Sequence, residues 1–193
     1  MNFDLVSPVP FPLYVGRMPT DFPSLPATAV LSLSEHPPEL PEGYRGLALP
    51  MVDRNDIDSL PTRNALNRFL LRAHRLAANE STYWHCHAGL NRSGFAVVAY
   101  LHLYRDLSVS VAIRALRAAR GPMALCNPTF ERALRDWYGG PEEQDFEPFS
   151  VEQYLLARDG HAIPSIDSRP IPMAEWDSTQ PTDLLTFDTD SDD

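Results

Sequence analysis

The 193-residue sequence contains no lysine: its 16 positively charged Lys or Arg residues are all arginine. This absence excludes mechanisms that use a lysine nucleophile or a lysine Schiff base. Cysteine is also scarce: two in the whole chain are too few for a disulfide framework, so we expect a reducing compartment such as the cytoplasm. No apolar run reaches the ~18 residues that a membrane helix needs, and residues 1–15 lack the pattern of a secretory signal.

The negative charge of the chain is concentrated toward its C-terminal end. Residues 141–193 contain 14 acidic and 2 basic residues, whereas residues 1–140 contain 12 acidic and 14 basic ones. We therefore expect one globular domain over 1–140, mildly basic and suited to an anionic substrate. The acidic, proline-containing tail over 141–193 is expected to be largely flexible, with one short helix at most, over 149–158.

Hydrophobic periodicity predicts an α/β fold in which a central sheet is flanked by helices. The prolines of residues 1–24 predict an irregular segment, apart from a short strand over 13–16. Further strands are predicted over 28–33, 44–52 and 81–85, and helices over 62–78, 93–104, 108–119 and 127–137. Thr62 and Asn127 are the expected N-caps of two of these helices.

A cysteine lies in a tight turn between the predicted strand over 81–85 and a predicted buried helix that begins near Ser93. The unpaired N–H groups and positive end of a helix make such a turn an anion site, and they favour the thiolate form of Cys86. If the chain curls at Gly89, backbone N–H groups form a bowl for phosphoryl oxygens. The residues that would line this bowl are His87, Ala88, Gly89, Leu90, Asn91 and Arg92. The sequence therefore predicts a phosphate-binding loop with Cys86 as nucleophile.

The side chains in and around this loop suggest distinct roles. The planar guanidinium of Arg92 can grip two phosphate oxygens at once. Ser93 can donate a hydrogen bond to the sulfur of Cys86 and help it leave in a second half-reaction. His85 is expected to orient the loop rather than transfer a proton, and the side chain of His87 is expected to point outward.

The order His-Cys, five residues, Arg and Ser resembles the signature loop of cysteine-based protein tyrosine and dual-specificity phosphatases. The likeness covers about residues 10–138, and its other matching segments are 13–16, 30–33, 49–53 and Asn127-Pro128-Thr129-Phe130. The last of these resembles a turn that supports the loop in the compact dual-specificity branch. The resemblance implies a compact phosphatase domain that hydrolyses phosphotyrosine esters, and by extension phosphoserine and phosphothreonine esters, through a cysteinyl-phosphate. It implies a phosphorylated protein or peptide as partner, a monomer, and no metal or other cofactor.

The resemblance also implies an aspartic acid, about thirty residues before the cysteine, that protonates the leaving oxygen and then activates water. Asp53 lies 33 residues before Cys86, at the end of a predicted strand, and is our preferred candidate. Asp56 and Asp58, 30 and 28 residues before Cys86, are the alternatives. A third interpretation is that all three aspartates lie on a loop and have no catalytic role.

Two other functions compete with this interpretation. The ending Asn91-Arg92-Ser93-Gly94 resembles the Asn-Arg-Thr-Gly of RNA 5′-triphosphatase loops in the same superfamily, for which the partner would be an RNA 5′ end. Those enzymes arrange their general acid differently, so a working Asp53 argues against this alternative. A catalytically weak phosphate-binding module is the alternative from a different class, and the presence of both Cys86 and Arg92 argues against it.

Overall fold

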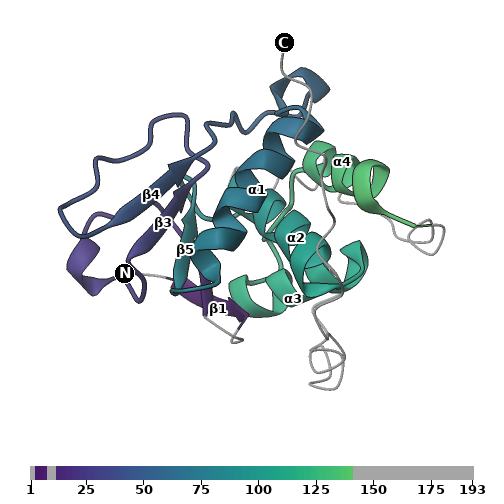
Figure 1. The fold of residues 1–193 in the computed structure, drawn as a ribbon. Helices are drawn as coiled ribbons and strands as arrows, with labels where there is room; N and C mark the ends of the chain where they lie inside the picture. Colours follow the sequence, from purple (N-terminus) through teal and green to yellow (C-terminus); the bar gives the residue numbers. More distant parts are fainter. Residues whose placement is uncertain (1–2, 8–11, 141–193) are drawn as a thin grey trace, which may run out of the picture.

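The computed structural model describes residues 3–7 and 12–140, so the predicted tail over 141–193, with its short helix over 149–158, lies outside the described residues. The strands are β1 (Phe3–Ser7), β2 (Leu13–Gly16), β3 (Ala29–Ser32), β4 (Arg45–Ala48) and β5 (Thr82–His85). The helices are α1 (Arg63–Ala77), α2 (Arg92–Arg105), α3 (Val109–Arg120) and α4 (Pro128–Tyr138), with short 3-10 turns η1 (Phe22–Ser24) and η2 (Ile57–Ser59). Figure 1 shows how these elements are arranged.

The strands form one sheet in the order β1-β2-β5-β3-β4. β1 runs antiparallel to β2, and the other neighbours are parallel. The strand β1 corrects our expectation that residues 1–24 are irregular apart from 13–16. No proline lies within residues 3–7, so this segment keeps the backbone N–H groups that pair it to β2.

The other strands and helices predicted within residues 12–140 are confirmed, with small shifts at their ends. The largest shift is in the strand predicted over 44–52, which the structure shortens to Arg45–Ala48. The N–H of Leu49 still donates to Ser32 O, at 2.9 Å. Pro50 follows with no N–H to donate, so the ladder cannot continue.

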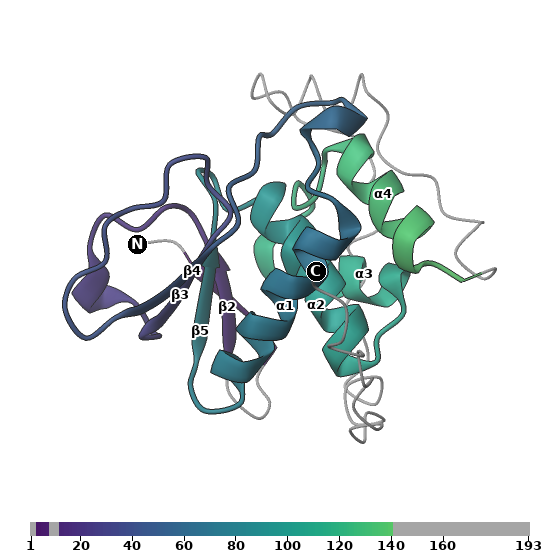
Figure 2. The same cartoon turned by 45° about the horizontal axis from the view of Figure 1, so that its top comes forward.

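Side chains of the sheet alternate between its two faces. Leu31 and Trp84 belong to the main core under the helices, whereas Val30 and Tyr83 belong to a smaller cluster on the other face. Figure 2 shows the four helices on one side of the sheet and the long loops on the other. Both faces of β3 and β5 are therefore covered, as is usual for parallel strands.

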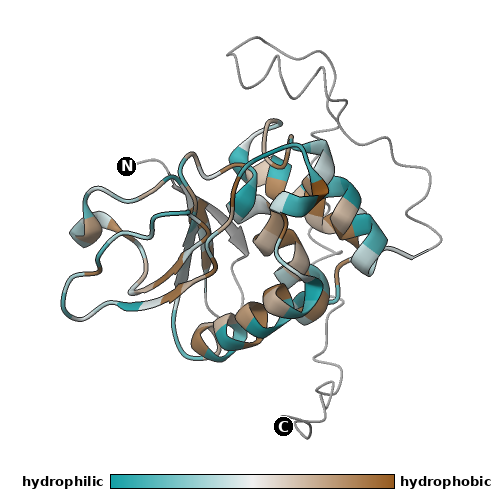
Figure 3. Ribbon diagram, turned by 90° about the horizontal axis from the view of Figure 1, so that it is seen from above, coloured by the Kyte–Doolittle hydropathy of each residue, from teal (hydrophilic) through white to brown (hydrophobic). Residues whose placement is uncertain are grey.

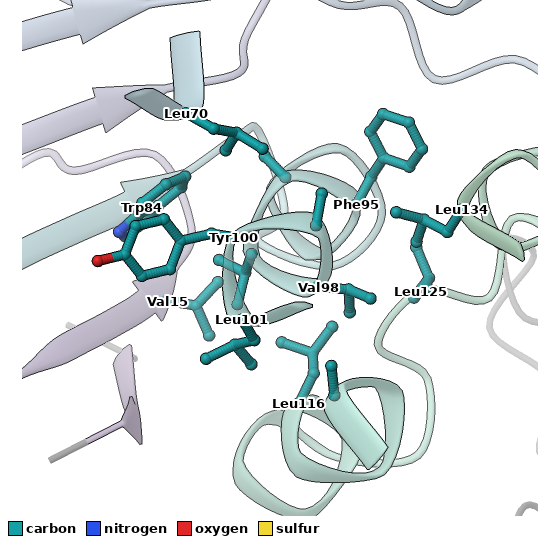
Figure 4. Packing of buried hydrophobic residues seen from close by; sticks show 14 of the residues in the cluster. Val15, Leu70, Trp84, Phe95, Val98, Tyr100, Leu101, Leu116, Leu125 and Leu134 are labelled. Carbon is teal, nitrogen blue, oxygen red and sulfur yellow. The ribbon is translucent and has the colours of Figure 1, made fainter. Parts of the chain in front are cut away.

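The helix α2 lies at the centre of the main core. It contacts α1, α3 and α4 as well as the strands β2 and β5. Figure 4 looks along this helix, with Phe95, Val98 and Leu101 surrounded by side chains from the sheet and the other helices. In Figure 3 the outer helices carry both hydrophilic and hydrophobic residues. Burial on all sides fixes α2 in place, and with it the loop at its N-terminus. Within the described residues, no helix combines the length and apolarity needed to cross a bilayer.

Two predicted N-caps are confirmed. Thr62 Oγ1 accepts a hydrogen bond from the N–H of Ala65, at 3.2 Å. Asn127 Oδ1 accepts from the N–H groups of Thr129 and Phe130, at 3.0 and 3.4 Å. Both contacts satisfy N–H groups that the first helical turn leaves unpaired.

Candidate active site

The loop after β5 places a thiol at the N-terminus of the central helix. Cys86 is 1% exposed, and its Sγ accepts a hydrogen bond from the N–H of Gly89, at 3.3 Å. The Oγ of Ser93 lies 3.5 Å from the same sulfur, as its predicted role requires. A backbone donor, a hydroxyl and a helix N-terminus therefore surround the sulfur, and each can stabilise negative charge that develops on it.

The backbone carbonyls from His85 to Asn91 each accept a hydrogen bond from a donor outside residues 86–92. The pairs are His85 O with Leu33 N (2.8 Å), Cys86 O with His85 Nδ1 (3.2 Å), His87 O with Met18 N (3.1 Å), Ala88 O with Arg120 Nη2 (3.1 Å), Gly89 O with Arg120 Nε (3.1 Å), Leu90 O with Leu125 N (3.2 Å) and Asn91 O with Phe95 N (2.8 Å). In a trans peptide the C=O and the following N–H point in opposite directions. The loop N–H groups are therefore directed away from these partners, as a phosphate-binding bowl requires.

Arg120, the last residue of α3, supports this loop and was missed by sequence reasoning. Its Nε and Nη2 donate to the carbonyls of Gly89 and Ala88. A guanidinium fork on two successive carbonyls fixes the plane of both peptide groups. No motif marks this arginine, and the one available signal is that it directly precedes the Gly121-Pro122 turn.

Gly89 has the conformation that the predicted curl requires. Its φ is +73°, in the left-handed region that glycine adopts without strain. A Cβ at this position would collide with the backbone of Gly16 and Arg17. The loop therefore packs directly on the end of β2, and any larger residue at 89 would displace it.

Arg92 begins α2 and lies largely buried beside the chain that leads to Asp53. Its Nη1 donates to Met51 O, at 3.1 Å, and lies 3.9 Å from Glu35 Oε2. Its side chain is 11% exposed, whereas that of Glu35 is 50% exposed. The guanidinium is thus held at the loop by the segment that carries the candidate acid.

The two histidines that flank Cys86 differ in their surroundings. His85 is fully buried, and burial lowers its pKa to about 4, against the smaller opposing effect of its hydrogen bond with Cys86 O. The ring is therefore neutral at physiological pH and orients the backbone, in line with its predicted role. His87 is exposed, which agrees with the expectation that it points outward.

The structure brings Asp53 to the phosphate loop. Asn91 Nδ2 donates to Asp53 Oδ2, at 3.1 Å, and lies 3.4 Å from Oδ1. Asn127 Nδ2 donates to Asp53 Oδ1 and to Arg54 O, at 2.9 Å each. Two amides from different parts of the chain therefore hold the Asp53 carboxylate beside the phosphate loop. The preferred assignment of the acid needs a carboxyl group in this place.

The alternative acids lie further along the same loop. Asp56 and Asp58 are both exposed, and the chain turns into η2 immediately after Asp56. The hydroxyl of Ser59 donates to Asp56 O, at 2.7 Å, which closes this turn on itself. The geometry supports Asp53 as the acid rather than Asp56 or Asp58.

The second cysteine, Cys126, lies behind the loop and is 4% exposed. Its Sγ donates to Asn91 Oδ1, at 3.4 Å, and burial raises the pKa of the thiol to about 11. This thiol is protonated at neutral pH and acts as a packed, hydrogen-bonding group.

The fold and the loop together define a class of protein. A mostly parallel sheet, a thiol at the N-terminus of a central buried helix and an arginine six positions later place the chain in the cysteine-based protein tyrosine phosphatase superfamily.

The comparisons with known proteins narrow this class. The family model "Dual specificity phosphatase, catalytic domain" matches residues 21–139, so the chain belongs to the dual specificity phosphatase family. It is 28% identical over 157 residues to dual specificity protein phosphatase 12 of Mus musculus, covering 79% of this chain and 45% of that one. It is 30% identical over 132 residues to dual specificity protein phosphatase 22 of Homo sapiens, covering 66% of this chain and 62% of that one. The chain thus spans about half the length of these relatives.

Solved structures share the fold. The crystal structure of human DUSP28 matches with a TM-score of 0.59 and 23% identity, over 70% of this chain and 92% of that one. The crystal structure of Tk-PTP in the active form matches with a TM-score of 0.55 and 27% identity, over 66% of this chain and 90% of that one. These matches bear out the predicted fold class.

Proposed function

We propose that this protein is a phosphoric monoester hydrolase that removes phosphate from phosphotyrosine, and from phosphoserine and phosphothreonine, through a cysteinyl-phosphate. Membership of the dual specificity phosphatase family supports the reaction class. The observation that carries the mechanism is that the loop carbonyls around Cys86 accept hydrogen bonds from donors outside the loop. It leaves preorganised N–H donors for the equatorial phosphate oxygens without any rearrangement during the reaction.

In the first step the Cys86 thiolate attacks phosphorus, and the bond from phosphorus to the ester oxygen breaks. Asp53 in its protonated form donates a proton to that oxygen, which leaves as an alcohol or phenol. Arg92 and the loop N–H groups bind the phosphoryl oxygens throughout. The clamp of Asn91 and Asn127 supports this role for Asp53, because it holds the carboxyl beside the phosphate loop.

In the second step water attacks the phosphorus of the cysteinyl-phosphate. The Asp53 carboxylate takes a proton from that water, and the phosphorus–sulfur bond breaks to release inorganic phosphate. Ser93 donates a hydrogen bond to the departing sulfur, which its distance of 3.5 Å from Cys86 Sγ supports. No metal or other cofactor enters either step.

The burial of the nucleophile supports phosphotyrosine as the preferred ester. Cys86 is 1% exposed, so a phosphate that is to reach its sulfur should lie far from the peptide backbone of the substrate. Phosphotyrosine meets this condition, because its ring separates the phosphate from the backbone. The side chains of phosphoserine and phosphothreonine are shorter. They reach the sulfur only if the segments around the pocket, residues 16–18, 53–58 and 122–126, rise little above it. The partner is a phosphorylated protein or peptide, and a reducing compartment such as the cytoplasm keeps the thiol active.

The test begins with hydrolysis of p-nitrophenyl phosphate by the wild-type protein and by Cys86→Ser. The proposal predicts turnover by the wild type and loss of at least about 10³-fold in the variant. A wild type that binds phosphate but shows no turnover would instead support a phosphate-binding module. Activity that survives Cys86→Ser would overturn the mechanism.

The substrate class is then tested with a phosphotyrosine peptide, a phosphoserine peptide and a triphosphate-ended RNA. The proposal predicts the highest kcat/KM on the phosphotyrosine peptide. The RNA alternative rests on the ending Asn91-Arg92-Ser93-Gly94, and preferential release of phosphate from the RNA would replace the proposal with it.

A further inference from the structure

Asn91 precedes α2 at the N-cap position, where asparagine ordinarily accepts a hydrogen bond from its own helix. In this position its side chain makes no capping bond. Thr62 and Ser108, by contrast, cap α1 and α3 with side-chain oxygens, and Asn127 caps α4. The first N–H groups of α2 are therefore left to the phosphate site, and the Asn91 amide is used elsewhere.

The Asn91 side chain links the phosphate loop to two other segments. Its Nδ2 donates to both oxygens of Asp53, at 3.1 and 3.4 Å. Its Oδ1 accepts from the backbone N–H of Asn127, at 3.1 Å, and from Cys126 Sγ, at 3.4 Å. Since Asn91 is 6% exposed and all these bonds use its amide, its orientation is fixed from both ends.

We propose that Asn91 is a positioning residue that fixes the general acid Asp53 relative to the nucleophile. The inference rests on the proposed function and concerns how its general acid is held in place. Asn91 belongs to the same loop as Cys86, so the acid is tied to the very segment that holds the phosphoryl group. The backbone of this residue faces the phosphate while its side chain holds the acid.

Asn127 provides the second amide, but its structural position differs from that of Asn91. Its Oδ1 caps α4, and its Nδ2 also binds Arg54 O. Replacing Asn127 would therefore disturb a helix as well as Asp53. Asn91 is the sharper site for a test, since no helix cap depends on its side chain.

The proposal predicts an effect that depends on the leaving group. Phenolate needs a proton as it departs, whereas the less basic nitrophenolate departs with little help. Asn91→Ala should lower kcat/KM about tenfold on phenyl phosphate, the scale of a hydrogen bond to a charged group, and less than about twofold on p-nitrophenyl phosphate. Inhibition by inorganic phosphate should stay within about twofold, because the loop N–H groups and Arg92 remain.

A double-mutant comparison separates positioning from general damage. In an Asp53→Asn background, Asn91→Ala should cause no additional loss on phenyl phosphate. The control Asn64→Ala, at an exposed position on α1, should change none of these values.

An equal loss on both aryl phosphates, or a further loss in the Asp53→Asn background, would overturn the inference while the phosphatase function stands. Failure of the function itself shows separately, as absent wild-type turnover or as activity in Cys86→Ser. If Asn91→Ala does not fold, Asn91→Ser replaces it. Its hydroxyl can accept from Asn127 N–H but is too short to hold both oxygens of Asp53, so the same selective loss is expected.

Discussion

The phosphate loop and the loop that carries Asp53 meet at the site but are held in different ways. The phosphate loop is largely buried, and each carbonyl from His85 to Asn91 has a partner. The acid loop is exposed from Arg54 to Asp58 and is held at its start. There Asp53 bonds to Asn91, Arg54 to the N-cap Asn127 and Asn55 to Thr129 of α4.

The difference matches the two tasks. Donors for a charged phosphoryl group stabilise it most when they are fixed before the reaction starts. An acid must meet leaving groups of different size, so an exposed loop with one fixed end suits it. Variants that act on one loop and spare the other therefore test the comparison.

The largest effect that separates the loops is expected from Asp53→Asn. Asparagine has nearly the size of aspartate but no carboxyl proton to donate, so kcat on a phosphotyrosine peptide should fall about 10²–10³-fold. Inhibition by vanadate should be unchanged, because the phosphate loop is intact. Asp58→Asn is the matched control and should retain wild-type turnover; a large loss there with little loss in Asp53→Asn would move the acid to the other end of the loop.

A smaller effect is expected from Arg120→Met, which removes the two guanidinium donors to Gly89 O and Ala88 O. Binding of vanadate should weaken about tenfold, and kcat/KM should fall with it for every aryl phosphate, since the donors are no longer fixed. Arg132→Met, at an exposed position on α4, is the control. Unchanged vanadate binding in Arg120→Met would show that the carbonyl anchors do not hold the bowl.

The buried ring of His85 predicts a contribution to the pH dependence of stability. Burial lowers its folded pKa from 6.5 to about 4, so as the pH falls the unfolded chain binds the proton first. The stabilising contribution is present above pH 6.5 and is lost as the pH falls to about 4, by about 3 kcal/mol. Urea unfolding at several pH values should show a shallower loss for His85→Gln than for the wild type; equal slopes would contradict the buried neutral ring.

The smallest of these effects is expected from iodoacetamide, which should react at different rates with the two thiols. Cys86 should be alkylated at pH 7, whereas Cys126, whose pKa burial raises to about 11, should react slowly until the protein unfolds. Peptide mass spectrometry of the native and unfolded protein measures both rates. Faster labelling of Cys126 than of Cys86 in the native state would contradict the environments described above.

The contacts that are local in sequence were predictable from spacing, and the placement of Asp53 was expected from the family resemblance. The other contacts that distant residues make with the phosphate loop were not predicted. The loop, the Thr62 and Asn127 caps and the contact of Ser93 with the sulfur follow from spacing and element type. Arg120 reaches Ala88 and Gly89 across more than thirty positions, and no sequence pattern states that its side chain turns toward them.

Asn91 shows a second limit of sequence reasoning. A residue of its type before a helix is normally a cap, and only the packing of Asp53 and Asn127 around it assigns the amide to another partner. The strand β1 was missed for a different reason, because the prolines around it outweighed a short segment whose pairing depends on β2.

The most direct test of the account is to trap the covalent intermediate. Wild-type protein mixed with a phosphotyrosine peptide and quenched in acid within milliseconds should carry one phosphate on the sulfur of Cys86, located by peptide mass spectrometry. Cys86→Ser should carry no phosphate on sulfur. Phosphate on any other residue, or full turnover of the peptide by Cys86→Ser, would contradict the account.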